Sequence, residues 1–516
     1  MAGAAGRRAG ALQPAVPVDG ATGCAAAARR RRQRRPAPRR GRAGVGVTQA
    51  LLIDLITWAI LAYFVALNIG YLALNLLSLA SLHRGRQEKV LEELPQVFTG
   101  LDPAISILVP AYNEQTSISA SIRSMLQLAY SDFEIIVIND GSKDKTLEVL
   151  KRAFALLPFP EAVHVRLETQ PIRAIYRSST HANLRVVDKD NGGKADSLNA
   201  GINLARNPLF CGVDADSILE RDSLQRVVRP FLRDWRVVAT GGTVRIANGC
   251  EIEEGFLTRV RLPTNLLALF QVVEYLRAFL FGRLGWSQLN AMLIISGAFG
   301  LFKTSVVIEA GGYRPNTIGE DMELVVRMHR MLRDQGIDYR VEFVPEPVCW
   351  TEAPEDRKTL RNQRIRWQRG LSESLSGNWG LMFNRRGGPP GWLAFPFMVA
   401  FEWLGPLIEL GGYVFMLFAY LAGIVSWDAF AVFLFVAIGL GILLSASGLL
   451  LEEMAFHVYP RLSDLALLAL VVVAENFGYR QLNSWWRLIG LYRWAAQTES
   501  KWGEMKRKGF GSGPGP

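Results

Sequence analysis

The sequence predicts an α/β domain with a mainly parallel sheet, flanked on both sides by hydrophobic helices. Three observations support this prediction. Short β-branched apolar runs alternate with helical patterns from Pro103 onward, polar motifs follow several of these runs, and two hydrophobic regions, residues 47–82 and 391–490, enclose the globular stretch. The 516 residues are enough for a sizeable core together with membrane segments.

The net charge of +11 belongs to the first 46 residues. This tail holds eleven arginines and one acidic residue, Asp19, so residues 47–516 carry only about +1. The tail is rich in Ala, Gly, Pro and Arg, and we expect it to be disordered. It can be a phosphate- or lipid-binding arm, or the native protein can begin near Val45 or Val47. Neither interpretation predicts a nucleic-acid-binding domain.

The first hydrophobic region, residues 47–82, predicts one transmembrane helix. Its apolar core exceeds the ~20 residues needed for a single span, but two spans would be cramped. Basic residues predict two opposite orientations for this helix. The Arg-rich tail predicts that the N-terminal side lies in the cytoplasm, whereas the basic residues at 84–89 predict that the globular domain does. The four cysteines form no C-x-x-C pair, which predicts neither zinc nor disulfides and fits a reducing compartment.

The globular stretch, residues 103–385, predicts the α/β domain itself. Helical patterns at 117–128 and 145–156 separate short runs that read as buried strands, and ligands of parallel sheets gather where such strands end. The five predicted strands are Ile105–Val109, Glu134–Asn139, Leu184–Val187, Leu209–Val213 and Val237–Thr240.

The C-terminal hydrophobic region, residues 391–490, predicts membrane and interfacial helices. Stretches 393–425 and 429–451 are long enough to span a bilayer, whereas 465–474 suits either a short span or an interfacial helix. The tryptophans and basic residues that follow suit the membrane interface, and residues 491–516 form a basic tail.

Polar motifs follow the first two predicted strands. Pro110, Tyr112 and Glu114 close the first strand, and Asp140 opens an Asp-Gly-Ser turn after the second. Because no G-x-G-x-x-G follows the first strand, the usual dinucleotide fingerprint is missing. Asp140 and Glu114 can instead offer acceptors to a nucleobase or ribose. Each motif alone can equally be an ordinary polar turn.

Two further motifs suit a diphosphate. Asp214 and Asp216 share a face of an extended segment, and two hard carboxylates suit Mg²⁺ or Mn²⁺, although a D-x-D pair can also be a plain acidic turn. Lys194 follows two glycines at a predicted helix start, where it can reach a phosphate or remain solvated.

A third group suits an acceptor and a base. Ser296 and Gly297 lie in a run of small residues that lets a ligand approach the backbone, or else forms a tight packing turn. Glu320 and Asp321 open a predicted helix, where a carboxylate can be either a simple cap or a rigidly held base.

The last motif is a Q-x-x-R-W box formed by Gln363, Arg366 and Trp367. Arg366 can bind phosphate oxygens in a bidentate way, Trp367 offers a stacking surface for a sugar, and Gln363 supplies an amide. The alternative is a solvated or lipid-facing helix, because Arg361, Arg364 and Arg369 surround the box.

The order of these motifs between hydrophobic flanks resembles the membrane-embedded family-2 glycosyltransferases, over about residues 103–370. That family includes cellulose, chitin, hyaluronan and poly-N-acetylglucosamine synthases. The resemblance implies a GT-A (Rossmann-like) domain and a nucleotide-sugar donor, commonly UDP-linked. It implies donor binding by Pro110, Tyr112, Glu114, Asp140, Lys194, Asp214, Gln363 and Arg366, acceptor binding by Ser296, Gly297, Glu320 and Trp367, Mg²⁺ or Mn²⁺ binding by Asp216 and Asp214, and catalysis by Asp321 as general base.

We therefore expect an inverting glycosyltransferase that moves a sugar from a UDP-sugar to a β-linked polysaccharide, with or without translocation. The alternatives are a transferase that adds one sugar to a lipid, and an inactive membrane scaffold. The expected place is the cell (inner) membrane, with several spans and a cytoplasmic catalytic domain. Residues 245–260 and 296–300 match no single synthase's signature, so the polymer stays unnamed.

Overall fold

The computed structural model describes residues 43–92, 102–253 and 256–498. The chain divides into two units, residues 1–55 and 56–516, and the described part of the first is the start of helix α1 (Ala43–Glu92). Of the Arg-rich tail, residues 1–42 lie outside the described residues, and so do residues 499–516 of the basic C-terminal tail. The expectations for those segments stay predictions.

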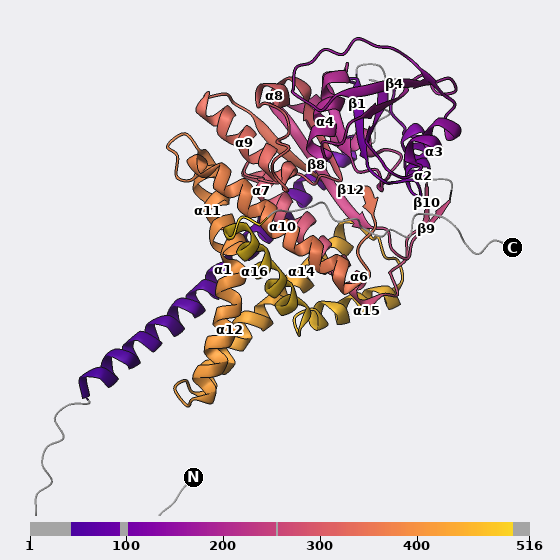
Figure 1. Cartoon of the computed structure of the whole chain (residues 1–516). Helices are drawn as coiled ribbons and strands as arrows, with labels where there is room; N and C mark the ends of the chain where they lie inside the picture. Colours follow the sequence, from indigo (N-terminus) through magenta and orange to yellow (C-terminus); the bar gives the residue numbers. More distant parts are fainter. Residues whose placement is uncertain (1–42, 93–101, 254–255, 499–516) are drawn as a thin grey trace, which may run out of the picture. The chain divides into compact units, whose positions relative to one another are not determined.

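A ten-stranded mixed sheet forms the centre of the second unit (Figure 1). Its spatial order is β3-β4-β5-β2-β1-β6-β11-β8-β12-β7, and β9 (Glu251–Glu253) pairs with β10 (Phe256–Arg259) separately. The ten strands are β1 (Ile105–Ala111), β2 (Phe133–Asp140), β3 (Leu156–Pro158), β4 (Ile172–Ser178), β5 (Leu184–Lys189), β6 (Leu209–Val213), β7 (Ile218–Leu219), β8 (Val237–Ile246), β11 (Phe299–Lys303) and β12 (Arg340–Thr351).

The parallel strands β5, β2, β1 and β6 form the part of the sheet that carries the predicted motifs. Both faces of this part are covered, and the residues of β5 and β6 are all buried, which fits the continuous apolar run of β6 and leaves three charged residues of β5 buried as well. The antiparallel strand β11 lies between β6 and β8, with Phe299 opposite Val213. The turn before β11 is thereby placed beside the end of β6.

All five predicted strands are present, so the predicted α/β class with a mainly parallel sheet is confirmed. Strands β3 and β7 at the two edges of the sheet, strands β4 and β11, and the long strand β12 were not predicted. Strand β12 contains charged residues, two prolines and three register shifts, so it shows no regular apolar pattern. The helices of the domain are α2 (Ile118–Leu126), α3 (Thr146–Ala153), α4 (Lys194–Leu204), α5 (Ser223–Arg233), α6 (Leu266–Tyr275), η1 (Leu276–Arg283), α7 (Leu284–Gln288), α8 (Thr304–Glu309), α9 (Glu320–Asp334) and α10 (Arg357–Gly377).

Two helices in the described part of the chain are long and apolar enough to cross a membrane: Leu51–His83 within α1, and Trp427–Phe456. Two further pairs of helices are long and apolar enough to cross a membrane only if the two bent helices of each pair are counted as one span. They are Pro390–Trp403 with α12 (Gly405–Leu421), bent by 46°, and α15 (Leu462–Ala474) with α16 (Tyr479–Ala495), bent by 56°. The described chain therefore has two to four candidate spans.

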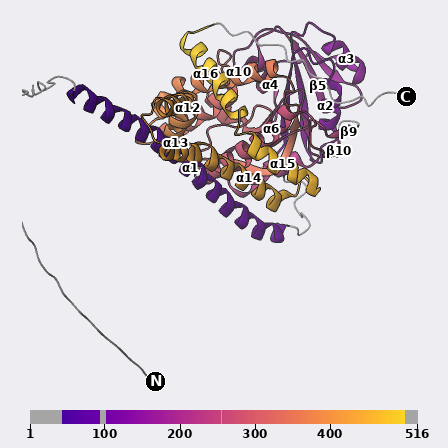
Figure 2. The ribbon, with the colours of Figure 1, turned by 90° about the horizontal axis from the view of Figure 1, so that it is seen from below.

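Helix α1, from Ile56 onward, packs against α12 and α13 (Trp427–Leu434), which lie beside it in Figure 2. The Phe64 and Phe433 rings meet edge to face at 5.5 Å, and Gly412 lets α12 approach Phe64 closely. The Asn68 amide donates to the carbonyl oxygen of Val436 at 3.3 Å. The part of α1 from Ile56 onward and the C-terminal hydrophobic helices thus form one group within the second unit.

Two ion pairs connect the α/β domain to this group. Arg245 at the end of β8 pairs with Glu452 of α14 (Leu440–Phe456), and both side chains are only 2% exposed. Arg277 of η1 lies 2.5 Å from Glu475, which follows α15. Since breaking a fully buried pair costs about 3–5 kcal/mol, the pair of Arg245 and Glu452 fixes α14 to strand β8 of the sheet.

Candidate active site

Several of the predicted site residues meet at the carboxyl edge of the parallel strands. Lys194, at the start of α4, lies at the centre of this group. Its Nζ is 2.5 Å from Asp214 Oδ1, 3.2 Å from the Gly297 carbonyl oxygen and 3.5 Å from Glu320 Oε1. These partners come from the segment after β6, the turn before β11 and the start of α9. A single cation therefore joins the predicted donor residues to the predicted acceptor residues.

Asp321 is held by two backbone amides. Its Oδ2 accepts a hydrogen bond from the Gly297 N–H at 3.0 Å, and its Oδ1 accepts one from the Met322 N–H at 2.8 Å. The first bond ties the start of α9 to the small-residue turn before β11. The carboxylate predicted to be the general base is thus oriented beside the predicted acceptor segment, as general-base catalysis requires.

The turn before β11 depends on its small residues. The Ser296 carbonyl oxygen accepts a hydrogen bond from the Phe299 N–H at 3.1 Å, which closes the turn. A Cβ atom on Gly297 would lie 2.8 Å from Lys194 Nζ and 3.4 Å from Asp321 Oδ2. A side chain at this position would therefore push the Lys194 ammonium away from the Gly297 carbonyl oxygen, whereas its contact with Asp321 would be an ordinary one.

Burial and charge act together on this cluster. Burial raises the pKa of Glu320 to about 7, against the opposing influence of Lys194. Burial by itself would lower the pKa of Lys194. The negative charges of Asp214 and Glu320 together have the larger effect and keep the pKa of this lysine above its ordinary value. The cluster therefore holds a permanently protonated lysine among carboxylates.

Asp140 supports the loop that leads to Lys194. Its carboxylate accepts hydrogen bonds from Lys189 Nζ at 2.8 Å, the Gly192 N–H at 2.9 Å, the Gly193 N–H at 2.8 Å and Asn191 Nδ2 at 3.0 Å. A carboxylate has about four lone-pair sites, so all of them are used here. The predicted contact of Asp140 with a uridine stays a prediction, and the observed contacts give it a structural task as well.

Lys189 is a site residue that the sequence analysis missed. Its side chain is fully buried at the end of β5, and its Nζ also lies 2.5 Å from Asp196 Oδ1. A lysine at a strand end gives no sequence signal for such burial. Only the pairing of β2 with β5 places Asp140 opposite Lys189.

The segments after β1 and β2 are joined by hydrogen bonds. The Asn113 Oδ1 accepts from the Lys143 N–H at 2.9 Å, and the Glu114 N–H donates to Thr146 Oγ1 at 2.8 Å. Asn113 has a φ of 57°, in the left-handed region that asparagine tolerates. The two predicted nucleotide-binding turns therefore form one surface.

The other two predicted residues of the first turn are placed beside this surface. Pro110 pairs with Ile138 of β2 within the sheet. The Tyr112 side chain follows it at the strand end and is 36% exposed. An exposed ring at the end of a parallel strand is available to a ligand.

Asp214 and Asp216 are the candidate metal ligands. Asp216 is 6% exposed, and the Asp214 side chain is 32% exposed and faces Lys194. The described residues contain no group of three or more His, Cys, Asp or Glu side chains arranged to hold a metal. The two carboxylates fit a hard cation whose other ligands come from a diphosphate and water.

The helix that carries the Q-x-x-R-W box, α10, packs directly on the segment that leads to Asp321. A Cβ on Gly370 would lie 2.8 Å from the Cα and N of Gly319, so the two backbones touch. Glu373 adds a hydrogen bond from the Ile318 N–H at 2.8 Å. The box and the candidate base are thus held in one rigid arrangement.

The three box residues differ in exposure. Gln363 is 8% exposed, and its Oε1 is buried without a hydrogen-bond partner among the described residues. Arg366 is half-buried, and Trp367 is 44% exposed. An unpartnered amide oxygen and an exposed indole on one helix are consistent with a binding role, which remains a prediction for each residue.

The alternative of a solvated or lipid-facing arginine helix is wrong for two of its three arginines. Arg364 is 2% exposed and its guanidinium lies 2.7 Å from Glu274 Oε2. Arg369 pairs with Glu373 at 2.9 Å. Only Arg361 is exposed, as that interpretation expected. The helix turns its arginines mostly toward the protein.

Arg283, at the end of η1, was also missed by the sequence analysis. Burial lowers its pKa to about 10, while the negative charge of Asp321 acts in the opposite direction. The residue therefore lies within the electrostatic reach of the candidate base. Its sequence context is an apolar helix, which gives no sign of a site.

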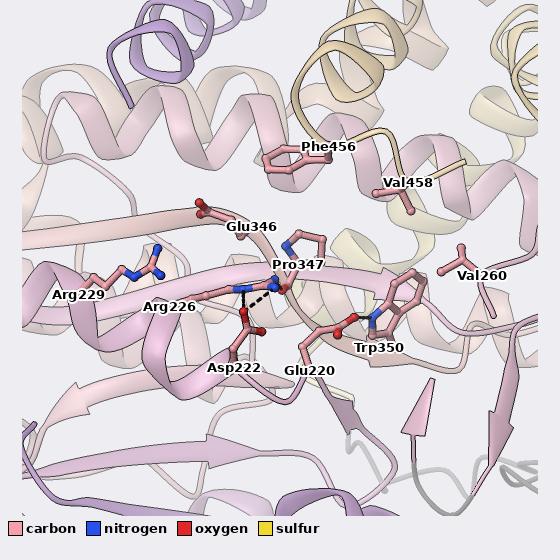
Figure 3. A pocket seen from close by; sticks show the side chains of 10 residues that line it. All are labelled: Glu220, Asp222, Arg226, Arg229, Val260, Glu346, Pro347, Trp350, Phe456 and Val458. Carbon is pink, nitrogen blue, oxygen red and sulfur yellow. Dashed lines mark hydrogen bonds and ion pairs between the residues drawn. The ribbon is translucent and has the colours of Figure 1, made fainter. Parts of the chain in front are cut away.

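A separate cavity of about 530 Å³ lies between α5, β12 and the segment after α14 (Figure 3). Its walls contain none of the predicted site residues. Several of its polar side chains already have partners: Arg226 Nε donates to Asp222 at 2.8 Å and Trp350 Nε1 to Glu220 at 2.6 Å. The candidate active site is therefore identified by its convergent side chains and not by this cavity.

Comparison with known proteins agrees with the predicted resemblance. Residues 103–370 match the family described as "Glycosyltransferase like family 2". The chain belongs to this family of glycosyltransferases. It is similar to the poly-beta-1,6-N-acetyl-D-glucosamine synthases of Staphylococcus aureus (strain COL) and Staphylococcus epidermidis, with 31% and 30% identity over 274 residues. Each match covers 52% of this chain and 55% of the relative, so it spans about half the length of either protein.

Solved structures show more distant likeness. The mannosyltransferase PcManGT from Pyrobaculum calidifontis, in complex with GDP-Man and Mn²⁺, has 18% identity and a TM-score of 0.48, covering 85% of this chain and 100% of that one. Residues 1–349 of TarS from S. aureus have 12% identity and a TM-score of 0.32, covering 76% and 89%.

Proposed function

We propose that this chain is an inverting membrane glycosyltransferase that transfers a sugar from a UDP-sugar to a growing β-linked polysaccharide. The observation that carries the proposal is the convergence of Lys194, Asp214 and Asp321 with the helix of the Q-x-x-R-W box, in a domain of glycosyltransferase family 2. Because the relatives are named as poly-beta-1,6-N-acetyl-D-glucosamine synthases, N-acetylglucosamine is the first sugar to test.

In this proposal Asp321 accepts the proton of the acceptor hydroxyl as that oxygen attacks the anomeric carbon. The two amides on Asp321 fix the direction from which the proton is taken. A single in-line displacement inverts the anomeric centre, so an α-linked donor gives a β-linked product. The departing diphosphate gains negative charge, which Lys194 and Arg366 are positioned to stabilise.

Asp216 and Asp214 would hold Mg²⁺ or Mn²⁺, which when bound supplies positive charge to the diphosphate. Lys194 Nζ lies 2.5 Å from Asp214 Oδ1 and neutralises its charge. With the metal bound, the lysine can turn toward the diphosphate or Glu320. The acceptor sugar would lie on Trp367 and against the turn of Ser296 and Gly297. This arrangement places it beside Asp321.

We place the catalytic domain on the cytosolic face of the cell membrane. The three described cysteines are free thiols, which supports a reducing compartment. The two to four candidate spans support a location in the membrane. Labelling of single introduced cysteines in intact cells with an impermeant reagent tests the side.

A second candidate, transfer of one sugar to a lipid, is favoured by the small number of straight spans, two in the described chain. A chain with few spans has less material for a channel. Sizing the product made from radiolabelled UDP-N-acetylglucosamine and UDP-glucose in vesicles separates polymer, glycolipid and an inactive scaffold.

The replacement Asp321→Asn tests the catalytic assignment. We expect the loss of about 10²- to 10⁴-fold in transfer, with UDP binding retained, because the amide keeps the shape but cannot accept the proton. The matched control is Asp334→Asn, at the exposed end of the same helix. Full turnover by Asp321→Asn would remove this residue as the base.

A further inference from the structure

The buried arginine of the box helix lies directly against its exposed tryptophan. The Arg364 guanidinium carbon is 4.4 Å from the Trp367 ring centroid, one helical turn away. No second ring or cation contact to Trp367 is found in the described part of the chain. One face of the indole is therefore covered by a cation, and 44% of the side chain remains exposed for a ligand.

Arg364 is in turn held from two other helices. Glu274 of α6 accepts a hydrogen bond from the Arg364 NH2 group at 2.7 Å. The same Glu274 oxygen accepts one from the Tyr479 hydroxyl, at the start of α16, at 2.9 Å. The Tyr479 ring stacks on Phe270 of α6 at 4.7 Å. Each member of this chain of contacts thus has a fixed partner.

We propose that Arg364 is a positioning residue that fixes the plane of the Trp367 indole, and that Glu274 and Tyr479 fix Arg364. The proposal deepens the proposed function and rests on it for the role of Trp367 in acceptor binding. A planar guanidinium can stack flat on an indole and bind a carboxylate at the same time, whereas a lysine ammonium has no flat face and makes only a point contact with the ring or the carboxylate.

The contacts also connect the acceptor surface to the membrane helices. Tyr479 directly follows Gly478, which has a φ of 103° and lies in the break where α15 and α16 meet at a bend of 56°. Helix α16 packs along α10, where a Cβ on Gly490 would lie 2.7 Å from the Ile365 carbonyl oxygen. The orientation of the indole is therefore set by the packing of a bent helix pair.

The first test measures kinetics on the full-length protein in vesicles, with a β-1,6-linked N-acetylglucosamine oligosaccharide as acceptor. Arg364→Lys keeps the charge opposite Glu274 but loses the stacking. We expect it to raise the acceptor KM roughly 3- to 30-fold and to leave the donor KM unchanged. Arg361→Lys, on the exposed side of the same helix, should change neither.

A double-mutant cycle asks whether Arg364 acts through Trp367. In a Trp367→Ala background the replacement Arg364→Lys should have no further effect on the acceptor KM, because the ring it orients is missing. Additive effects of the two substitutions, or a normal acceptor KM in Arg364→Lys alone, would overturn the proposal. Tyr479→Phe is a milder second variant and should show the same pattern at a smaller size.

A second readout does not depend on turnover. The full-length protein labelled with 5-fluorotryptophan gives a ¹⁹F signal for Trp367, assigned by its loss in Trp367→Phe. Arg364→Lys should shift or broaden this signal, and Arg361→Lys should not. An unchanged signal in Arg364→Lys refutes the positioning role. A shifted signal in a protein that transfers no sugar refutes the proposed function and leaves the positioning role standing.

Discussion

The contact between Gly370 and Gly319 allows a sharp test of the arrangement of the box helix and the candidate base. In Gly370→Ala the new Cβ would lie 2.8 Å from the Cα and N of Gly319. Both neighbours are backbone atoms, so no side chain can rotate away. An ordinary contact needs 3.4 Å, so the two backbones must separate by about 0.6 Å.

This separation moves the box helix relative to Asp321. Trp367 and Arg366 lie one turn before Gly370, and a misplacement of about 1 Å can lower a rate about 10²-fold. We expect Gly370→Ala to lose roughly 10- to 100-fold in transfer while still binding UDP. The overpacking itself should cost about 1–3 kcal/mol in the free energy of unfolding.

The assay compares initial rates of radiolabel transfer with UDP affinity and thermal stability in detergent. Gly377→Ala is the matched control, because it is on the same helix and its Cβ would meet nothing within 4 Å. Gly319→Ala should reproduce the loss from the opposite side, since its Cβ would lie 2.9 Å from the Gly370 carbonyl group. Wild-type rates in Gly370→Ala would show that the two segments need no close contact.

Two further predictions concern pH and metal. Burial lowers the pKa of His329 to about 4. As the pH falls below about 6.5, only the unfolded chain gains a proton at this residue, so the folded state becomes less stable. From pH 7 to pH 5 the free energy of unfolding should decrease by about 2 kcal/mol. Melting temperatures measured across this pH range check the expectation. The melting temperature of His329→Gln should depend less on pH. An equally steep decrease in that variant would show that His329 does not cause the loss of stability. Removal of divalent metal with EDTA should abolish transfer, and Mg²⁺ or Mn²⁺ should restore it; full activity in the metal-free protein contradicts the tasks of Asp214 and Asp216.

The predictable part of the fold comes from its buried parallel strands. Their continuous apolar runs are read directly from the sequence, and the rule that ligands gather at strand ends brings Asp140, Asp214 and Lys194 to one edge. The acidic start of α9 and the Q-x-x-R-W box follow from their chemistry. These residues need only local pattern and chain order to be found.

The remainder depends on contacts between distant segments. The burial of Lys189 follows from the pairing of β5 with β2, and the burial of Arg364 from Glu274, 90 residues earlier in the chain. Arg283 ends a largely apolar helix, for which the sequence analysis predicted no site. A pattern within one segment cannot show which side chain another segment will cover.

The buried pair of Arg245 and Glu452 has a consequence for how the protein is assembled during synthesis. Glu452 lies near the C-terminal end of α14, and inserting that helix into a bilayer without its partner would leave a carboxylate without a counter-charge. Arg245 is synthesised about two hundred residues earlier and belongs to the sheet. The α/β domain that contains Arg245 is thus synthesised before α14. The end of α14 must then stay on the side of the membrane where this domain has folded.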